Sequence, residues 1–301
     1  MTIGFIGLGK MGANMTKRLV EAGHKVLAYD PNPDARITAA NGGVETYESR
    51  SALLVALEQQ IVWLMIPPEY VDDELDALLD EVNDDAIVID GGNSDYRLSI
   101  KRAARAAERN VAFIDIGTSG GILGPERGYA MMVGGDKNSV KKLNPILNDL
   151  APTDGWDYFG PSGSGHFVKM AHNAIEYGLM QSYAEGYQLL KDGPFKDIDL
   201  AAAASVWQNG SIIQSLLNQL ATKTLTKNPK LDGIDGIVAE SGETRWALEV
   251  ADKHDVTLPA IKAAFQARLD SQDGQINFAT KLVAALRNQF GGHDLNEGSK
   301  Q

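Results

Sequence analysis

Short apolar runs alternate with amphipathic stretches through the first half of the chain. The apolar runs lie at residues 2–6, 25–30, 61–66, 86–90, 111–116 and 129–136. Stretches with helical spacing separate them, at residues 13–22, 49–58, 70–82, 139–150 and in a segment that ends near residue 109. Apolar runs without alternation are typical of a parallel sheet that helices cover on both faces. We therefore predict a doubly wound α/β domain over residues 1–162, with ligands at the carboxyl ends of its strands.

The pattern changes after residue 162. Residues 166–192 have the spacing of one long helix, which Gly193 and Pro194 end. Further helical stretches begin near residues 199, 212, 244 and 259, and another covers residues 278–290. No stretch in this half has the pattern of a strand. We predict an all-helical second domain over residues 163–301, with the long helix as its central member.

A glycine motif connects the first apolar run to the first helix. Gly7, Gly9 and Gly12 fill the positions of GxGxxG directly after residues 2–6. In a strand–turn–helix context these glycines allow a tight turn, close approach of a pyrophosphate and close packing of helix on strand. The helix N-terminus then offers free N–H groups to the phosphates. A Rossmann-like dinucleotide site is expected, with these cofactor contacts: Gly7, Leu8, Gly9, Lys10, Met11 and Gly12.

Asp30, at the end of the second predicted strand, bears on the choice of cofactor. A carboxylate there accepts hydrogen bonds from the ribose hydroxyls of NAD and repels the 2′-phosphate of NADP. The first cation after it is Arg36. We therefore expect NAD, with NADP as the alternative. Asp30 as a simple turn residue before Pro31 is the other interpretation.

A polar stripe lies near the start of the long helix, in the segment KMAHNAIEYG. Lys169, Asn173 and Glu176 are spaced i, i+4 and i+7, so they share one helix face, with His172 beside them. Such a face must meet water, a polar partner or a polar substrate. The apolar run that follows favours a site. The alternatives are a surface lysine, a core histidine, and a glutamate paired with a cation on another helix.

Charge and composition narrow the class of protein. The formal net charge of −12 argues against nucleic acid or an anionic membrane as a partner. The absence of cysteine excludes disulfides and thiolate chemistry. We see no apolar run of membrane-spanning length, no signal peptide and no metal-ligand cluster, so we expect a cytoplasmic protein that needs no metal.

Five motifs resemble the 6-phosphogluconate dehydrogenase family, within the β-hydroxyacid dehydrogenases. They are GFIGLGKMGANM, DGGNSDY, TSGG, GSGHFVKMAHNAIEYG and LRNQFGGH. The patterns KxxHNxxEYG and RxxFGGH are the specific ones, and the length resembles the short bacterial form. The segment SGETRW, residues 241–246, lacks a lysine that binds phosphate in the long form.

The resemblance implies a role for each matching residue. Lys169 would be the general base and then acid, and Glu176 a second acid. Asn93 would contact both the substrate and the nicotinamide. Arg268 matches a phosphate-binding arginine, although its local spacing departs by one residue. The implied substrate contacts are Asn93, Ser119, Gly120, Gly121, His172, Asn173, Tyr177, Arg268, Arg287 and His293.

The implied activity is oxidative decarboxylation of 6-phospho-D-gluconate to D-ribulose 5-phosphate and CO2, a step of the pentose phosphate pathway that serves gluconate utilization. A lysine accepts a proton only when neutral, and its free pKa is about 10.4, so burial or a nearby cation is required. The resemblance also implies a homodimer or homotetramer. A dehydrogenase of the 3-hydroxyisobutyrate type, without decarboxylation, and a non-catalytic NAD-binding sensor are the alternatives.

Overall fold

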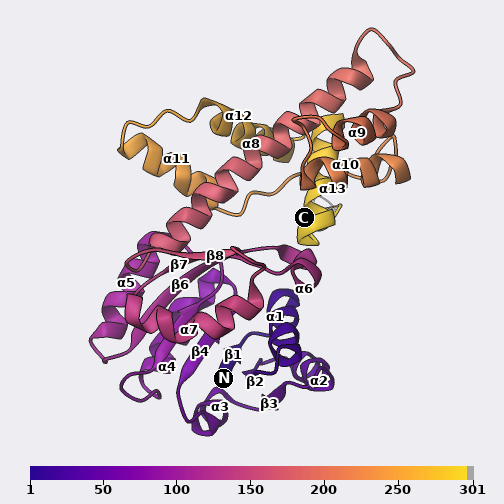
Figure 1. Ribbon diagram of the computed structural model, residues 1–301. Coiled ribbons are helices and arrows are strands. Elements are labelled where there is room, and N and C mark those ends of the chain that lie inside the picture. The colour runs from indigo at the N-terminus through magenta and orange to yellow at the C-terminus, as the bar shows by residue number, and fades with distance from the viewer. Residues whose placement is uncertain (297–301) are drawn as a thin grey trace. The chain divides into compact units, whose positions relative to one another are not determined.

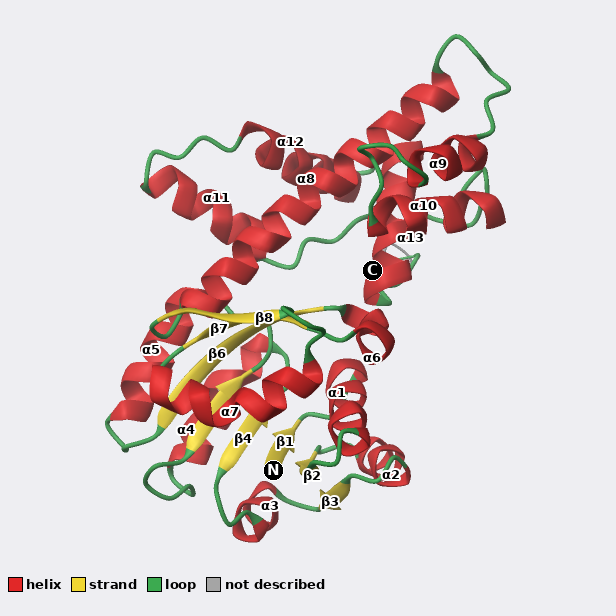
Figure 2. Ribbon diagram, viewed as in Figure 1, coloured by secondary structure: helices red, strands yellow, loops and turns green. Residues whose placement is uncertain are grey.

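The computed structural model describes residues 1–296, which fall into two compact units divided at Met170 and Ala171. The first unit is a sheet with helices, and the described part of the second is helical (Figures 1 and 2). This confirms the predicted fold class. Helix α8 (Ser164–Asp192) gives its first turns to the first unit and the rest to the second. The domain boundary expected after residue 162 stays a prediction.

An eight-stranded sheet forms the first unit. Its strand order is β3-β2-β1-β4-β5-β6-β7-β8. The strands are β1 (Thr2–Ile6), β2 (Lys25–Tyr29), β3 (Glu45–Tyr47), β4 (Ile61–Leu64), β5 (Ile87–Asp90), β6 (Ala112–Ser119), β7 (Ala130–Gly134) and β8 (Trp156–Gly160). The sequence analysis missed β3 and β8. Both lie at sheet edges and are partly exposed, so neither forms an apolar run.

The sheet is mixed, with one antiparallel pair. Strand β7 runs antiparallel to β6, and all other neighbours are parallel. A parallel return requires a crossover of about a dozen residues or more. Residues 120–129 hold only short turns of helix, η2 (Gly121–Leu123) and α6 (Gly124–Arg127), so the chain turns back beside β6.

Helices cover both faces of the sheet (Figure 2). Helices α1 (Lys10–Glu21), α2 (Pro33–Asn41) and α7 (Lys137–Leu150) contribute to the apolar core on one face. Helices α3 (Arg50–Ala56), α4 (Val71–Leu79) and α5 (Tyr96–Ala107) contribute to the core on the other. A short 3-10 turn, η1 (Pro68–Tyr70), precedes α4. Because strands such as β4 are buried throughout, their sequences are apolar without alternation.

Strand order reverses between β1 and β4. The chain moves outward from β1 to β2 and β3, and returns to the other side of β1 with β4. Ligands of doubly wound sheets bind at such a switch point, outside the carboxyl ends of the strands. The glycine motif begins there, where the Gly7 N–H donates to the Tyr29 carbonyl at 2.9 Å and the Met65 N–H donates to the Ile6 carbonyl at 2.8 Å.

The second unit packs its remaining helices around the later turns of α8. They are α9 (Leu200–Gln208), α10 (Leu216–Lys227), α11 (Glu243–Lys253), α12 (Pro259–Gln272) and α13 (Phe278–Gly291). Tyr187 of α8 is buried in this core, and its hydroxyl donates to Asn218 at 2.5 Å. Helix α10 begins four residues later than the expected start at residue 212. The reason is local, since the Ser215 side chain accepts the Asn218 N–H and caps the helix.

Candidate active site

The glycine turn between β1 and α1 has the shape that a pyrophosphate needs. Gly7 has φ +99°, and a Cβ there would lie 2.3 Å from the Met65 carbonyl oxygen. A Cβ on Gly12 would lie 2.0 Å from the Gly7 carbonyl oxygen, so only glycine allows this closeness. By contrast, beyond its chain neighbours and the local helix backbone, no atom of the described chain lies within 4 Å of a Cβ built on Gly9. The residues present fit a dinucleotide, with the α1 N-terminus open toward its phosphates.

Asp30 is held against the same turn. One carboxylate oxygen accepts the Leu8 N–H at 2.7 Å and the other accepts the Asn32 N–H at 2.8 Å. The Arg36 guanidinium donates to the carbonyls of Asp30 and Pro31, at 2.7 and 3.3 Å. The sequence analysis gave Arg36 no contact with Asp30, because helix α2, which carries Arg36, was not predicted. In the structure this cation lies beside Asp30, close to the place where the 2′-phosphate of NADP would bind.

Asn93 lies in the loop between β5 and α5. Its side-chain oxygen is buried and has no hydrogen-bond partner among residues 1–296. A buried acceptor without a donor costs about 1–3 kcal/mol, so it favours a ligand that brings one. Ser119 ends β6, the strand next to β5, and Gly120 and Gly121 follow it. These four residues therefore come from the carboxyl ends of two neighbouring parallel strands.

Lys169 lies in the second turn of α8 and is 5% exposed. The helix rests directly on β6, because a Cβ added to Gly117 would lie 2.2 Å from Lys169 Cβ and 2.8 Å from its Cγ. Gly117 precedes Ser119 by two residues. The first unit thus brings Asn93, Ser119 and Lys169 together from three different elements.

In the second unit, polar side chains of α8 contact one another and α11. His172 Nδ1 lies 3.0 Å from Asn173 Oδ1 and 3.8 Å from a Glu176 carboxylate oxygen. The Asn173 amide nitrogen donates to Glu243 at 2.9 Å. This bond requires the Asn173 NH2 to face Glu243, so its oxygen faces His172. Glu176 lies one helical turn from His172, and its carboxylate also interacts electrostatically with the Arg268 guanidinium of α12.

A buried cation lies next to this cluster. The Arg268 guanidinium stacks over the Tyr177 ring, 3.2 Å from its centroid, and donates to the Ala239 carbonyl at 3.3 Å. Burial, with a smaller effect of Arg287, lowers the pKa of Arg268 to about 10. Its Nη2 is buried without a hydrogen-bond partner among the described residues. An unsatisfied guanidinium nitrogen is a ready donor to a phosphate or carboxylate.

Arg287 and His293 also come together within one chain. Arg287 of α13 is buried, and its Nη2 lies 3.5 Å from His293 Nδ1. The Asn288 amide donates to the His293 carbonyl at 2.7 Å, which holds the segment after α13 against that helix. The terminal motif RxxFGGH therefore forms a local turn that presents a guanidinium and an imidazole side by side.

Comparison with known proteins identifies the family. Residues 2–160 match the model of the NAD binding domain of 6-phosphogluconate dehydrogenase, and residues 165–292 match that of its C-terminal domain. The chain belongs to the 6-phosphogluconate dehydrogenase family. It is 39% identical to YqeC of Bacillus subtilis, a provisionally named 6-phosphogluconate dehydrogenase, over 97% of this chain and 98% of that one.

A second full-length relative is the NAD(+)-dependent, decarboxylating 6-phosphogluconate dehydrogenase of Haloferax volcanii. It is 38% identical over 98% of each chain. The decarboxylating enzyme of Bacillus licheniformis is 33% identical over 80% of this chain but only 55% of its own length. The chain is therefore a short form of the family, as its length predicted.

Solved structures agree with this family membership. The 6-phosphogluconate dehydrogenase of Plasmodium falciparum superimposes with a TM-score of 0.82 at 27% identity, covering 95% of this chain and 70% of that one. The 3-hydroxyisobutyrate dehydrogenase of Mycobacterium tuberculosis superimposes with a TM-score of 0.74 at 23% identity, covering 95% and 99%. At that identity the second match shows a shared fold only.

Glu243 is a candidate site residue that the sequence analysis missed. It begins α11, is 5% exposed, and has one oxygen bonded to Asn173 and the other without a partner among residues 1–296. It lies in SGETRW, the segment noted only for its missing lysine. Its place in that segment was the one signal that the sequence offered. Its contact with Asn173 could not be predicted, because the two residues are seventy positions apart.

The described residues contain neither a metal-binding cluster nor a membrane-spanning helix. Among residues 1–296, no three His, Asp or Glu side chains gather closely enough to hold a metal ion. Within the same residues, no helix combines the length and apolar character needed to cross a membrane.

Proposed function

We propose that this protein oxidises and decarboxylates 6-phospho-D-gluconate to D-ribulose 5-phosphate and CO2, with NAD as hydride acceptor, in the pentose phosphate pathway. The observation that carries the proposal is Arg268, a guanidinium that is buried against Tyr177 and has an unsatisfied nitrogen. A phosphorylated sugar acid brings the anion that satisfies it. The name of the Haloferax volcanii relative supports the same activity.

Lys169 is the proposed base. Its side chain is buried, and in its neutral form the amine can take the proton of the substrate C3 hydroxyl. Bound NAD supplies the acceptor for the hydride that leaves C3. The unsatisfied Asn93 oxygen is a suitable acceptor for a hydroxyl or carboxamide N–H, which fits its proposed contacts with substrate and nicotinamide.

The same groups serve the carbon–carbon cleavage. Oxidation at C3 gives a β-keto acid, which loses CO2 once its carbonyl is polarised. Protonated Lys169 donates to that oxygen, and the resulting enediol then needs a proton at C1. We assign the donation of this proton to Glu176. His172 lies next to it, one helical turn away. Ser119, Gly120 and Gly121 would hold the substrate carboxylate and hydroxyls, and His172 and Asn173 would bind its hydroxyls.

NAD is the proposed cofactor, with NADP as the alternative. Asp30 supports NAD because its carboxylate would face the 2′-phosphate of NADP at the end of β2. Arg36 weakens this discrimination, since its guanidinium lies beside the Asp30 carbonyl. Measurement of kcat/KM with each cofactor decides between them.

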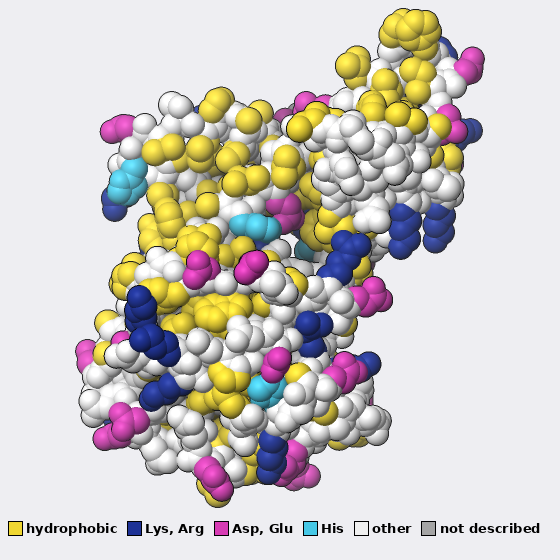
Figure 3. Space-filling view, viewed as in Figure 1, with side chains coloured by type: hydrophobic (Ala, Val, Ile, Leu, Met, Phe, Trp, Pro, Cys, Tyr) yellow, Lys and Arg dark blue, Asp and Glu magenta, His cyan; other side chains and the backbone are white. Residues whose placement is uncertain are grey.

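A homodimer or homotetramer is the proposed assembly. The second unit exposes several large apolar side chains on and after α8, among them Ile175, Leu179, Leu189, Phe195, Val206 and Ile212. Hydrophobic side chains are also visible on the surface at the upper right of Figure 3. Exposed apolar side chains in such number favour burial against another chain. Arg287 and His293 would then complete the site of a neighbouring subunit.

One assay tests the activity. Purified protein is given NAD with either 6-phosphogluconate or 3-hydroxyisobutyrate, and NADH and CO2 are measured together. We expect equal amounts of NADH and CO2 from 6-phosphogluconate. NADH from 3-hydroxyisobutyrate without CO2 would support the alternative dehydrogenase, and no turnover of either would support a non-catalytic NAD-binding protein.

A further inference from the structure

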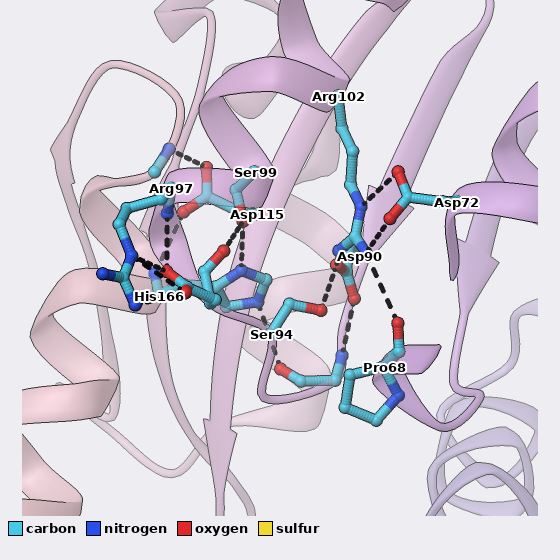
Figure 4. Close-up of polar contacts among 12 residues, drawn as sticks. Pro68, Asp72, Asp90, Ser94, Arg97, Ser99, Arg102, Asp115 and His166 are labelled. Carbon is cyan, nitrogen blue, oxygen red and sulfur yellow. Dashed lines mark hydrogen bonds and ion pairs between the residues drawn. The ribbon is translucent and has the colours of Figure 1, made fainter. Parts of the chain in front are cut away.

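His166 is a buried histidine, 1% exposed, that the proposed chemistry does not use. Its Nε2 lies 3.1 Å from the Gly92 carbonyl oxygen and its Nδ1 lies 2.7 Å from the Ser99 hydroxyl (Figure 4). A carbonyl only accepts hydrogen bonds, so Nε2 must carry the proton. In the neutral ring Nδ1 then accepts the Ser99 proton. Both nitrogens of His166 are therefore used, each by a different segment of the first unit.

Asp90 holds the backbone of Gly92 through its N–H group. One Asp90 oxygen accepts the Gly92 N–H at 3.2 Å, and the other accepts the Ser94 hydroxyl at 2.7 Å and Arg102 Nη1 at 3.1 Å. Arg102 is fully buried and is anchored in turn by Asp72 at 2.8 Å. Residues 92–94 are thus tied to the body of the unit, and Asn93 is the middle residue of this loop.

The backbone of His166 is fixed as well. Its N–H donates to an Asp115 carboxylate oxygen at 3.0 Å, and the other oxygen accepts the Gly163 N–H at 2.7 Å. Asp115 belongs to β6 and is fully buried. Because it accepts these two N–H groups, its carboxylate caps the N-terminus of α8. Lys169 follows His166 by three residues, less than one helical turn.

We infer that His166 is a positioning residue that sets the spacing between Asn93 and Lys169. Its imidazole holds the peptide that leads into Asn93, while its backbone belongs to the helix turn that carries Lys169. The inference rests on the proposed function, because Asn93 and Lys169 matter together only if both act on one substrate. An ordinary core histidine would contribute volume and stability, whereas a positioning one must donate to the Gly92 carbonyl.

Two substitutions separate these roles. In His166→Gln the amide nitrogen reaches the place of Nε2 and can still donate to the Gly92 carbonyl. In His166→Asn the shorter amide reaches only the place of Nδ1, near Ser99. We expect His166→Gln to keep most of kcat and His166→Asn to lose about 10²-fold, the usual effect of a 1 Å misplacement. The Kd for NAD should stay unchanged in both.

His24 provides the matched control. It is another buried histidine of the first unit, and its ring nitrogens contact the Met1 amino group at 3.2 Å and Asp149 at 2.7 Å. His24→Gln and His24→Asn should change the melting temperature without separating in kcat. If the two His166 variants lose kcat equally, the donor to Gly92 is irrelevant and the inference is wrong.

Amide hydrogen exchange tests the positioning role without any turnover. Peptides covering residues 91–95 should exchange faster in His166→Asn than in wild type, and at wild-type rates in His166→Gln and in the His24 variants. Unchanged exchange in His166→Asn would overturn the inference. A wild type that fails to oxidise 6-phosphogluconate would instead refute the proposed function, and the exchange result would still stand on its own.

Discussion

Gly117→Ala offers a sharp test of whether Lys169 must lie where the structure places it. Gly117 lies in β6, and the added Cβ would be 2.2 Å from Lys169 Cβ and 3.2 Å from the Gly165 carbonyl oxygen. Neither neighbour is the flexible end of a side chain. Relief therefore requires α8 to move away from the sheet, and Lys169 to move with it.

The size of the movement follows from the contact distances. Ordinary contact begins at 3.4 Å, so Lys169 Cβ must retreat by at least 1.2 Å from the new methyl at 2.2 Å. A displacement of about 1 Å at a reacting group costs about 10²-fold in rate. Overpacking of this kind typically costs about 1–3 kcal/mol of stability, which leaves most of the protein folded. The glycine turn follows β1, three strands away in the sheet, so NAD affinity should not change.

The assay measures kcat with 6-phosphogluconate, the Kd for NAD and the melting temperature of the same preparations. Gly186→Ala is the control, because it lies on the same helix α8 and, apart from its own helix backbone and chain neighbours, no atom of residues 1–296 lies within 4 Å of its added Cβ. That change should raise stability by up to about 1 kcal/mol and leave kcat alone. Wild-type kcat in folded Gly117→Ala would refute the claim that the position of Lys169 limits the chemistry.

Further substitutions address the individual proposed roles. Lys169→Met should lower kcat by about 10²–10⁴-fold with little change in NAD affinity, and near-normal turnover would remove it from the mechanism. Asp30→Ser combined with Pro31→Arg should shift the ratio of kcat/KM values toward NADP, whereas a wild type that already prefers NADP contradicts our interpretation of Asp30. Arg287→Ala should raise KM for 6-phosphogluconate much more than for gluconate, and an equal rise would exclude a phosphate contact. Mixing Arg287→Ala with Lys169→Met subunits should restore part of the activity if sites are shared, and a fully active monomer in sedimentation would rule sharing out. Glu243→Ala should lower kcat/KM by about 10- to 100-fold, corresponding to about 1.5–3 kcal/mol for a hydrogen bond to a charged group, because the Asn173 amide loses its fixed orientation; unchanged kcat/KM would show that this bond is dispensable.

Local patterns predicted much of the architecture. The glycine motif, the strand before it and Asp30 after the next strand were all predicted, because each depends on residues close in the chain. The helical spacing of Lys169, Asn173 and Glu176 was likewise predicted and is realised in α8. Apolar runs identified the buried central strands, since a strand covered on both faces must be apolar throughout. The three-residue edge strand β3 carries no such signal.

Partners of the site residues were decided only by the tertiary structure. Arg36 lies beside Asp30 because α2 turns it back, Glu243 meets Asn173 because α11 packs against α8, and His166 meets Gly92 because α8 begins on β6. The direction of β7 likewise follows from the short connection after β6, which returns the chain antiparallel to that strand. Hydrophobic periodicity indicates only which face of a helix or strand is buried. Which distant side chain satisfies a buried donor or acceptor is set by packing, because that choice depends on the geometry of the whole fold.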